Sequence, residues 1–223
     1  MCSSDLRVPE LLLSIKEEVD GDPRPGRFLL TGSARVLGLR GLPDALPGRT
    51  ESIELWPFSQ GEIDDAPDGF VDAIFEQGAD LAHTSQVSRN DYAERIVRGG
   101  FPEAVARPTA RRRERFFDSY VGDLIARDVA QLSEIERTAE MRTLLRLLAA
   151  RSGQLLVGNS LSNEVSLSAK SIHRYLGLLE EVFLIKRVPA WTRNLGNRAI
   201  GTPKLAFVDS GIAANRSEEH TSE

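Results

Sequence analysis

The sequence predicts an α/β segment followed by a mainly helical region that ends in a winged-helix module. Two observations predict the first part. Residues 28–30 form a short, wholly apolar run that opens into a Thr-Gly-Ser loop, and residues 50–56 alternate before Pro57 stops them. Short apolar runs that end in polar loops are typical of buried parallel strands. A third observation predicts the second part, because helical periods dominate from residue 91 onward.

Composition and charge narrow the class of protein. The chain has 223 residues, 41% of them hydrophobic, which suits one sizeable core or two modest ones. It has no apolar run of about 18 residues and no signal-peptide pattern at its start, so we expect no membrane partner. The single cysteine, Cys2, cannot form an internal disulfide, and a cytoplasmic protein is the simplest expectation.

The net charge of −5 is unevenly divided along the chain. Residues 1–90 carry 8 basic and 16 acidic side chains, which gives −8, whereas residues 141–215 carry 10 and 4, which gives +6. The later segment is therefore a basic module on an acidic chain. Such a stretch can mark a nucleic-acid site, although Arg-rich helices are more often solvated faces.

Local signals place the expected elements. Helical periods and start signals predict helices over residues 7–19, from the capping box of Ser59 and Glu62, from Asp91 to Gly99, and over residues 109–131, 138–151 and 169–181. Ser168 is the expected N-cap of the last of these helices, and residues 183–188 are an expected strand. Helix, helix, turn, helix and strand is the order of a winged helix.

Six short motifs stand together in one order along the chain. They occupy residues 7–12, 27–34, 48–49 with 55–59, 99–103, 127–128 and 207–211. Together they resemble a large prokaryotic family of AAA-type P-loop ATP-binding proteins whose C-terminal part is a domain of unknown function. The resemblance covers nearly everything from Arg7 to Ala214, and the ordered set is more specific than any one motif.

The resemblance implies an ATPase core, a helical region, a winged helix and a nuclease-like C-terminal domain. The family's glycine-rich loop should lie upstream of Arg7, and no G-x-x-x-x-G-K-[ST] pattern occurs in these residues. ATP and Mg²⁺ are therefore expected cofactors of a complete parent protein, whereas this chain alone should not hydrolyse ATP. A homo-oligomer is compatible with this reading, because an arginine can reach a phosphate from a neighbouring subunit.

The two ends of the chain differ from its interior. Residues 1–6 and 216–223 resemble peptides translated from sequencing-adapter DNA, so we expect non-native tails on a truncated fragment; frayed native termini are the alternative. On this view, residues 7–80 are the later part of an AAA-like ATPase domain and residues 81–140 a helical region. Residues 141–215 are then a winged-helix-like module with the start of a C-terminal domain.

Three polar residues are candidates for sensing the ATP phosphates in the complete parent. Thr31 and Ser33 follow the strand that, in the resembling family, lies beside the magnesium-binding strand. Arg49 is the candidate guanidinium for contact with phosphate. Each has a simpler interpretation, because a Thr-Gly-Ser turn can bond to local backbone and Arg49 can be an ordinary surface side chain.

Four basic residues are candidates for nucleic-acid contact. Lys170, His173 and Arg174 lie early on the predicted recognition helix, and Arg187 could touch a backbone phosphate. Nearby acidic residues weaken this interpretation, and many winged helices serve only as packing modules. The three histidines of the chain are too scattered to suggest a metal site.

These features favour a fragment of a prokaryotic ATP-binding protein in which nucleotide binding drives a winged-helix and effector module. A second interpretation is a winged-helix DNA-binding regulator or scaffold without enzymatic activity, in which residues 7–80 serve as a dimerisation layer. A third is a truncated gene prediction with no function of its own.

Overall fold

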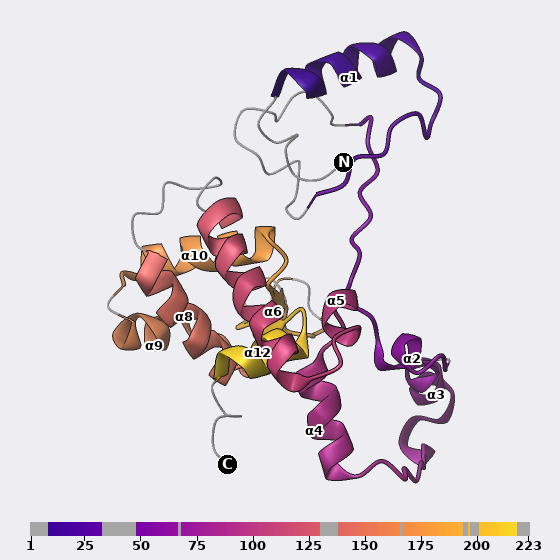
Figure 1. The fold of residues 1–223 in the computed structure, drawn as a ribbon, viewed down its shortest axis with the longest axis vertical. Coiled ribbons are helices and arrows are strands. Elements are labelled where there is room, and N and C mark those ends of the chain that lie inside the picture. Colours follow the sequence, from indigo (N-terminus) through magenta and orange to yellow (C-terminus); the bar gives the residue numbers. More distant parts are fainter. Residues whose placement is uncertain are drawn as a thin grey trace.

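The described part of the chain is mainly helical. A computed structural model describes residues 9–32, 48–66, 68–129, 138–165, 167–193, 196 and 201–217. Figure 1 shows helix α1 (Pro9–Gly21) at one end of the molecule, joined by an extended stretch of chain to a larger helical body. The contacts that build the candidate site all lie within this body.

The helical body consists of short helices and one small sheet. The helical segments are α2 (Gln60–Ile63), α3 (Phe70–Gln77), the 3-10 turn η3 (Gly78–Asp80), α4 (Arg89–Arg98), α5 (Pro102–Val105), α6 (Ala110–Asp123), the π-helical η4 (Leu124–Val129), α8 (Thr138–Ala150), α9 (Gly158–Glu164), α10 (Ala169–Glu181) and α12 (Ser210–Ser217). Strands β1 (Ile185–Val188) and β2 (Lys204–Phe207) pair antiparallel, with Ile185 opposite Phe207. Among the helices described, none is long and apolar enough to cross a lipid bilayer.

One apolar core lies in the second half of the chain. Its largest fully buried side chains are Phe117, Val121, Met141, Leu144, Leu145, Leu148, Leu161, Ile172, Leu179, Leu184, Leu205 and Ile212. The last helix, α12, contacts α4, α6 and α8, which precede it by many residues. Because α12 is the common neighbour of these helices, the residues at its start are well placed to hold distant segments together.

Several helices begin where the sequence predicts. Ser59 and Glu62 form the predicted capping box of α2, which confirms that start signal. Ser168 accepts a hydrogen bond from the backbone N–H of Ser171, as expected for the N-cap of α10. The start signal at Asp91 is wrong by three residues, because the capping box of α4 pairs Ser88 with Asp91.

The structure corrects the α/β expectation, because neither of the two strands predicted in the N-terminal segment is formed in the described part of the chain. Residues 28–30 have no regular secondary structure and no strand partner among the described residues, and Leu29 is 88% exposed. Residues 50–56 likewise have no strand partner there, and Leu55 is 93% exposed. A strand requires a neighbour for its backbone N–H and C=O groups, and an apolar run alone does not supply one. The described chain is thus mostly helical with a two-stranded sheet.

Candidate functional site

Three segments that are far apart in the sequence meet beside the end of α4. We call the meeting point of residues 57–59, 99–101 and 209–212 the motif junction, because each segment belongs to, or continues, a motif on which the family resemblance depends. The backbone N–H of Phe58 donates to the carbonyl oxygen of Gly100 at 2.8 Å. This bond fixes the end of the extended segment against the turn that follows α4.

The carboxylate of Asp209 is the centre of the motif junction. Asp209 is only 3% exposed; its Oδ2 accepts from the backbone N–H of Gly100 at 2.6 Å, and its Oδ1 accepts from that of Ile212 at 2.9 Å. Burial raises the pKa of Asp209 above its ordinary value of 3.8, whereas hydrogen bonds from the backbone of Gly100, Ile212, Gly211 and Phe101 oppose that rise. With both oxygens engaged by backbone, the carboxylate holds segments together and is poorly placed to act on a ligand.

Two glycines allow the backbones to approach this closely. Gly99 has φ 66° and ψ −165°, a conformation that is essentially restricted to glycine. A Cβ atom on Gly99 would lie 2.5 Å from Oδ1 of Asp209, and one on Gly100 would lie 2.2 Å from the carbonyl oxygen of Phe58. No side chain fits at either position without moving the segment opposite.

Aromatic side chains of α6 pack against the motif junction. The ring of Phe101 lies 5.0 Å from that of Tyr120 and 6.2 Å from that of Phe116, measured between centroids. A Cβ atom on Gly211 would lie 2.5 Å from the Phe117 ring, so α12 starts directly against α6. The junction therefore adjoins the apolar core on the side of Phe101 and Gly211.

Two of the three phosphate-sensing candidates, Thr31 and Arg49, lie in the described part of the chain. Thr31 is exposed, and Ser33 lies outside the described residues. Arg49 forms an ion pair with Asp20 near the end of α1, with 2.5 Å between its Nε and Oδ1, and this hydrogen bond is the main cause that lowers the pKa of Asp20. Their role in sensing phosphate stays a prediction.

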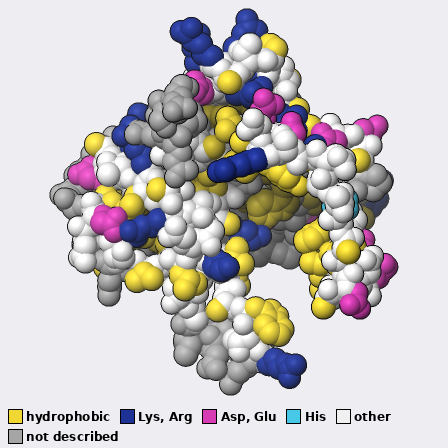
Figure 2. Space-filling model, turned by 90° about the horizontal axis from the view of Figure 1, so that it is seen from below, with side chains coloured by type: hydrophobic (Ala, Val, Ile, Leu, Met, Phe, Trp, Pro, Cys, Tyr) yellow, Lys and Arg dark blue, Asp and Glu magenta, His cyan; other side chains and the backbone are white. Residues whose placement is uncertain are grey.

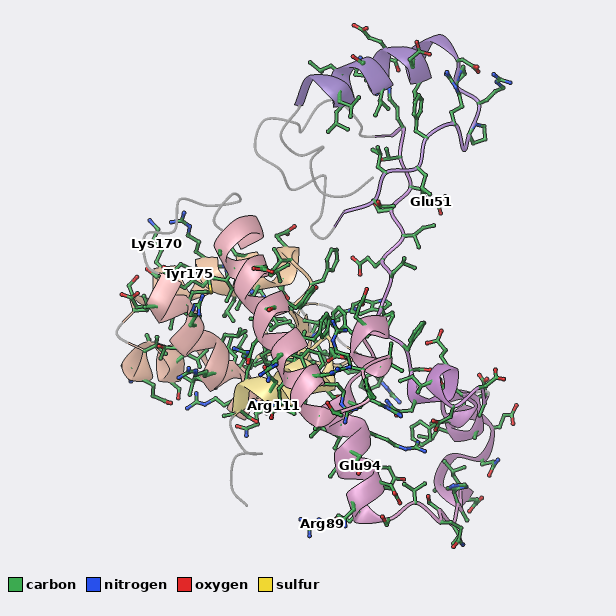
Figure 3. The ribbon with its side chains drawn as sticks, in the orientation of Figure 1. Glu51, Arg89, Glu94, Arg111, Lys170 and Tyr175 are labelled. Atoms are coloured by element: carbon green, nitrogen blue, oxygen red, sulfur yellow. The ribbon has the colours of Figure 1, made fainter. Side chains whose placement is uncertain are left out.

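The four nucleic-acid candidates divide into two groups. Lys170, His173 and Arg174 are exposed in the first half of α10, and Figure 3 shows Lys170 on the outer side of that helix. Arg187 on β1 instead donates from Nε to Oε2 of Glu180 at 2.8 Å, and this contact raises its pKa. Only the first group presents basic side chains toward solvent.

No catalytic centre is evident in the part of the chain that the structure describes. Within it, no group of three His, Cys, Asp or Glu side chains could hold a metal ion. Figure 2 shows one face of the molecule, on which Lys and Arg side chains are scattered and hydrophobic side chains gather in several places. The best-built polar feature is the motif junction, whose geometry suits the connection of segments.

Two family models match different parts of the chain. Residues 89–222 match the family model described as "Domain of unknown function (DUF8612)", and residues 6–64 match the one described as "AAA domain". Uncharacterized proteins of Mycobacterium tuberculosis and Mycobacterium bovis are each 27% identical over 208 residues, which cover 92% of this chain and 41% of theirs. One from Haemophilus influenzae is 25% identical over 83% of this chain and 44% of its own. No solved structure matches the chain.

The chain thus spans less than half the length of these relatives. The two family matches also show which matched regions meet at the motif junction. Phe58 lies in the AAA-matched residues, whereas Gly100 and Asp209 lie in the DUF8612-matched residues. The junction is therefore a contact between the two matched regions, formed by motifs from both.

Proposed function

This chain belongs to the family of the domain of unknown function DUF8612, and on that premise we propose that it couples an AAA-type nucleotide-binding region to that domain. The observation that carries the proposal is the motif junction, in which Phe58 is bonded to Gly100 and Gly100 to Asp209. A coupling element needs a defined contact through which movement of one region reaches the other. A buried, fully bonded carboxylate supplies such a contact.

Further contacts support the same link. Nζ of Lys186 on β1 lies 4.3 Å from the centroid of the Trp56 ring, which is a cation–π contact between the extended segment and the sheet. Asp64 of the AAA-matched region is paired with Arg95 of α4 at 2.9 Å. The chain therefore enters the DUF8612 region through several anchored residues, although the stretch before them is extended and exposed.

On this proposal the nucleotide would bind to a longer protein that includes the glycine-rich loop. ATP with Mg²⁺ would bind through a glycine-rich loop that these 223 residues do not contain, and Thr31, Ser33 and Arg49 would sense its phosphates. Arg49 would then exchange its partner Asp20 for phosphate oxygens. The effect on the DUF8612 region would pass through residues 57–59.

Hydrogen exchange on the protein expressed from its complete gene tests this proposal. We expect ATP with Mg²⁺ to bind and to change the exchange rates of the Gly100 and Ile212 amides, which donate into the junction, while the core amide of Leu148 stays unchanged. ATP binding without any change at the junction would refute coupling, and no binding would refute the nucleotide assignment. The 223-residue chain is the control, since a micromolar Kd for ATP would contradict the argument from the missing loop.

A second candidate function rests on the order of elements after α8. Helices α8, α9 and α10 are followed by the β1–β2 pair, and Leu155 forms an isolated bridge with Lys204 of β2. This order supports the winged-helix hypothesis, in which α10 would enter a DNA groove with Lys170, His173 and Arg174 foremost. On this alternative the chain is a DNA-binding regulator or scaffold.

Duplex binding by the whole chain separates the two candidates. For the regulator we expect binding that weakens steeply with salt, and Lys170→Gln should reduce the salt slope by about 1 if Lys170 contacts a phosphate. Lys16→Gln on α1 is the control, because Lys16 is paired with Asp20 at 2.9 Å, away from α10. Absence of a shift at low salt would exclude the regulator.

A further inference from the structure

A charged pocket lies beside the motif junction, on α4 and α6. Its volume is about 470 Å³. Six charged side chains line it: Asp64, Asp91, Glu94, Arg95, Arg98 and Arg113. The lining thus contains three carboxylates and three guanidinium groups. Which ligand the pocket could bind depends on which of these groups already have partners within the protein.

Two of the three carboxylates are committed within the protein. Asp64 pairs with Arg95 at 2.9 Å, and Asp91 accepts from the backbone N–H of Ser88 at 2.7 Å in the capping box of α4. That hydrogen bonding, from the Ser88 side chain first, lowers the pKa of Asp91 and keeps it ionised. Glu94 forms neither a hydrogen bond nor an ion pair with any residue that the structure describes, and it is exposed.

Two of the three arginines lack a carboxylate partner among the residues that the structure describes. Arg98 donates from Nη2 to Oε1 of Gln60 at 2.9 Å, and Arg113 donates from Nη1 to the carbonyl oxygen of Arg107 at 3.1 Å. Both partners are neutral. The Nε atoms of Arg98 and Arg113 are buried and have no hydrogen-bond partner among the described residues. A guanidinium has five N–H donors, so each side chain holds unused donors, and neither is in a direct ion pair with a described carboxylate.

From this arrangement we propose that the pocket binds a phosphate group of a small molecule between Arg98 and Arg113. The planar guanidinium presents parallel N–H groups that match two oxygens of a phosphate, and two arginines neutralise its double charge. The pocket is large enough to hold a phosphate with a substituent. Glu94 and the ionised Asp91, which also line the pocket, repel the anion and keep the affinity moderate. The site is independent of the nucleotide site in the proposed function.

Titration calorimetry of the whole chain at constant ionic strength tests the site. Inorganic phosphate and ADP are the two probes, since they share the phosphate group but only one carries a nucleoside. We expect saturable binding, a Kd raised about 10-fold or more by Arg98→Gln or Arg113→Gln, and a Kd lowered several-fold by Glu94→Gln. Equal Kd values would identify the phosphate group alone as the ligand. A much lower Kd for ADP that Arg98→Gln raises would identify a nucleoside phosphate in this pocket, whereas one that Arg98→Gln leaves unchanged would place the nucleotide elsewhere on the chain.

Matched controls lie on the same two helices. Arg89 begins α4 and Arg111 lies near the start of α6 (Figure 3). Neither residue lines the pocket. Arg89→Gln and Arg111→Gln should leave both Kd values within about 2-fold of wild type. No saturation with either probe by about 20 mM, or equal weakening by the control variants, would overturn the proposal. If an arginine variant fails to fold, Glu94→Gln decides, because an unchanged or raised Kd there contradicts the site.

Discussion

Replacing Asp209 by alanine removes the acceptor on which the motif junction depends. The N–H of Ile212 loses its cap, which costs about 0.5–2 kcal/mol. The buried N–H of Gly100 loses its 2.6 Å bond and is left without an acceptor, which costs about 1–3 kcal/mol. We therefore expect Asp209→Ala to lower the free energy of unfolding by about 1.5–5 kcal/mol.

Denaturant unfolding followed by circular dichroism measures this loss. Asp118→Ala is the matched control, because Asp118 is also an aspartate bonded across the fold, to Arg216, but its side chain is 62% exposed. An exposed ion pair contributes at most about 1 kcal/mol, so the control should stay close to wild type. If Asp209→Ala costs no more than Asp118→Ala, the junction does not hold the segments together and the coupling argument fails.

Three further predictions concern the same fold. Burial raises the pKa of Asp209, so the free energy of unfolding of wild type relative to Asp209→Asn should be greatest below pH 3.8 and should fall as pH rises through the raised pKa. Denaturation measured across pH tests this, and a relative stability that rises with pH would contradict the assignment. Gly100→Ala should cost about 2–4 kcal/mol and increase the rate at which proteases cut the exposed residues 51–56, because its Cβ would lie 2.2 Å from the Phe58 carbonyl oxygen and displace the end of that segment. Gly122→Ala, with open space around it, should change neither quantity. The chain should self-associate in light scattering, and Phe75→Glu should reduce this because Phe75 is 86% exposed; unchanged scattering would exclude that surface.

The helices of the second half were predictable because their signals are local. The predicted helix over residues 169–181 coincides with α10, and the one over residues 138–151 differs from α8 by one residue. Apolar side chains at a 3.6-residue period, with a Ser N-cap, specify a helix without reference to distant residues. The strand predicted at residues 183–188 is confirmed as the shorter β1.

The prediction of two N-terminal strands was wrong because a strand depends on neighbouring strands that the local sequence does not reveal. The apolar run at residues 28–30 satisfies the strand pattern, yet Leu29 is largely exposed and no described residue pairs with it. The motif junction was hidden for a related reason. Sequence spacing does not reveal that Gly100 meets Asp209, although the Gly-Gly pair signals a close approach of backbone.

The charged pocket and the motif junction adjoin at the end of α4. Arg98 lines the pocket, and the next two residues, Gly99 and Gly100, form the junction. A phosphate that holds Arg98 would also restrain the turn that presents the Gly100 N–H to Asp209. Linkage requires the effect to be reciprocal, so a weaker junction should weaken binding in the pocket. We expect Asp209→Asn to raise the Kd for phosphate, while Asp118→Ala does not; equal Kd values for wild type and Asp209→Asn would show that the two sites are independent.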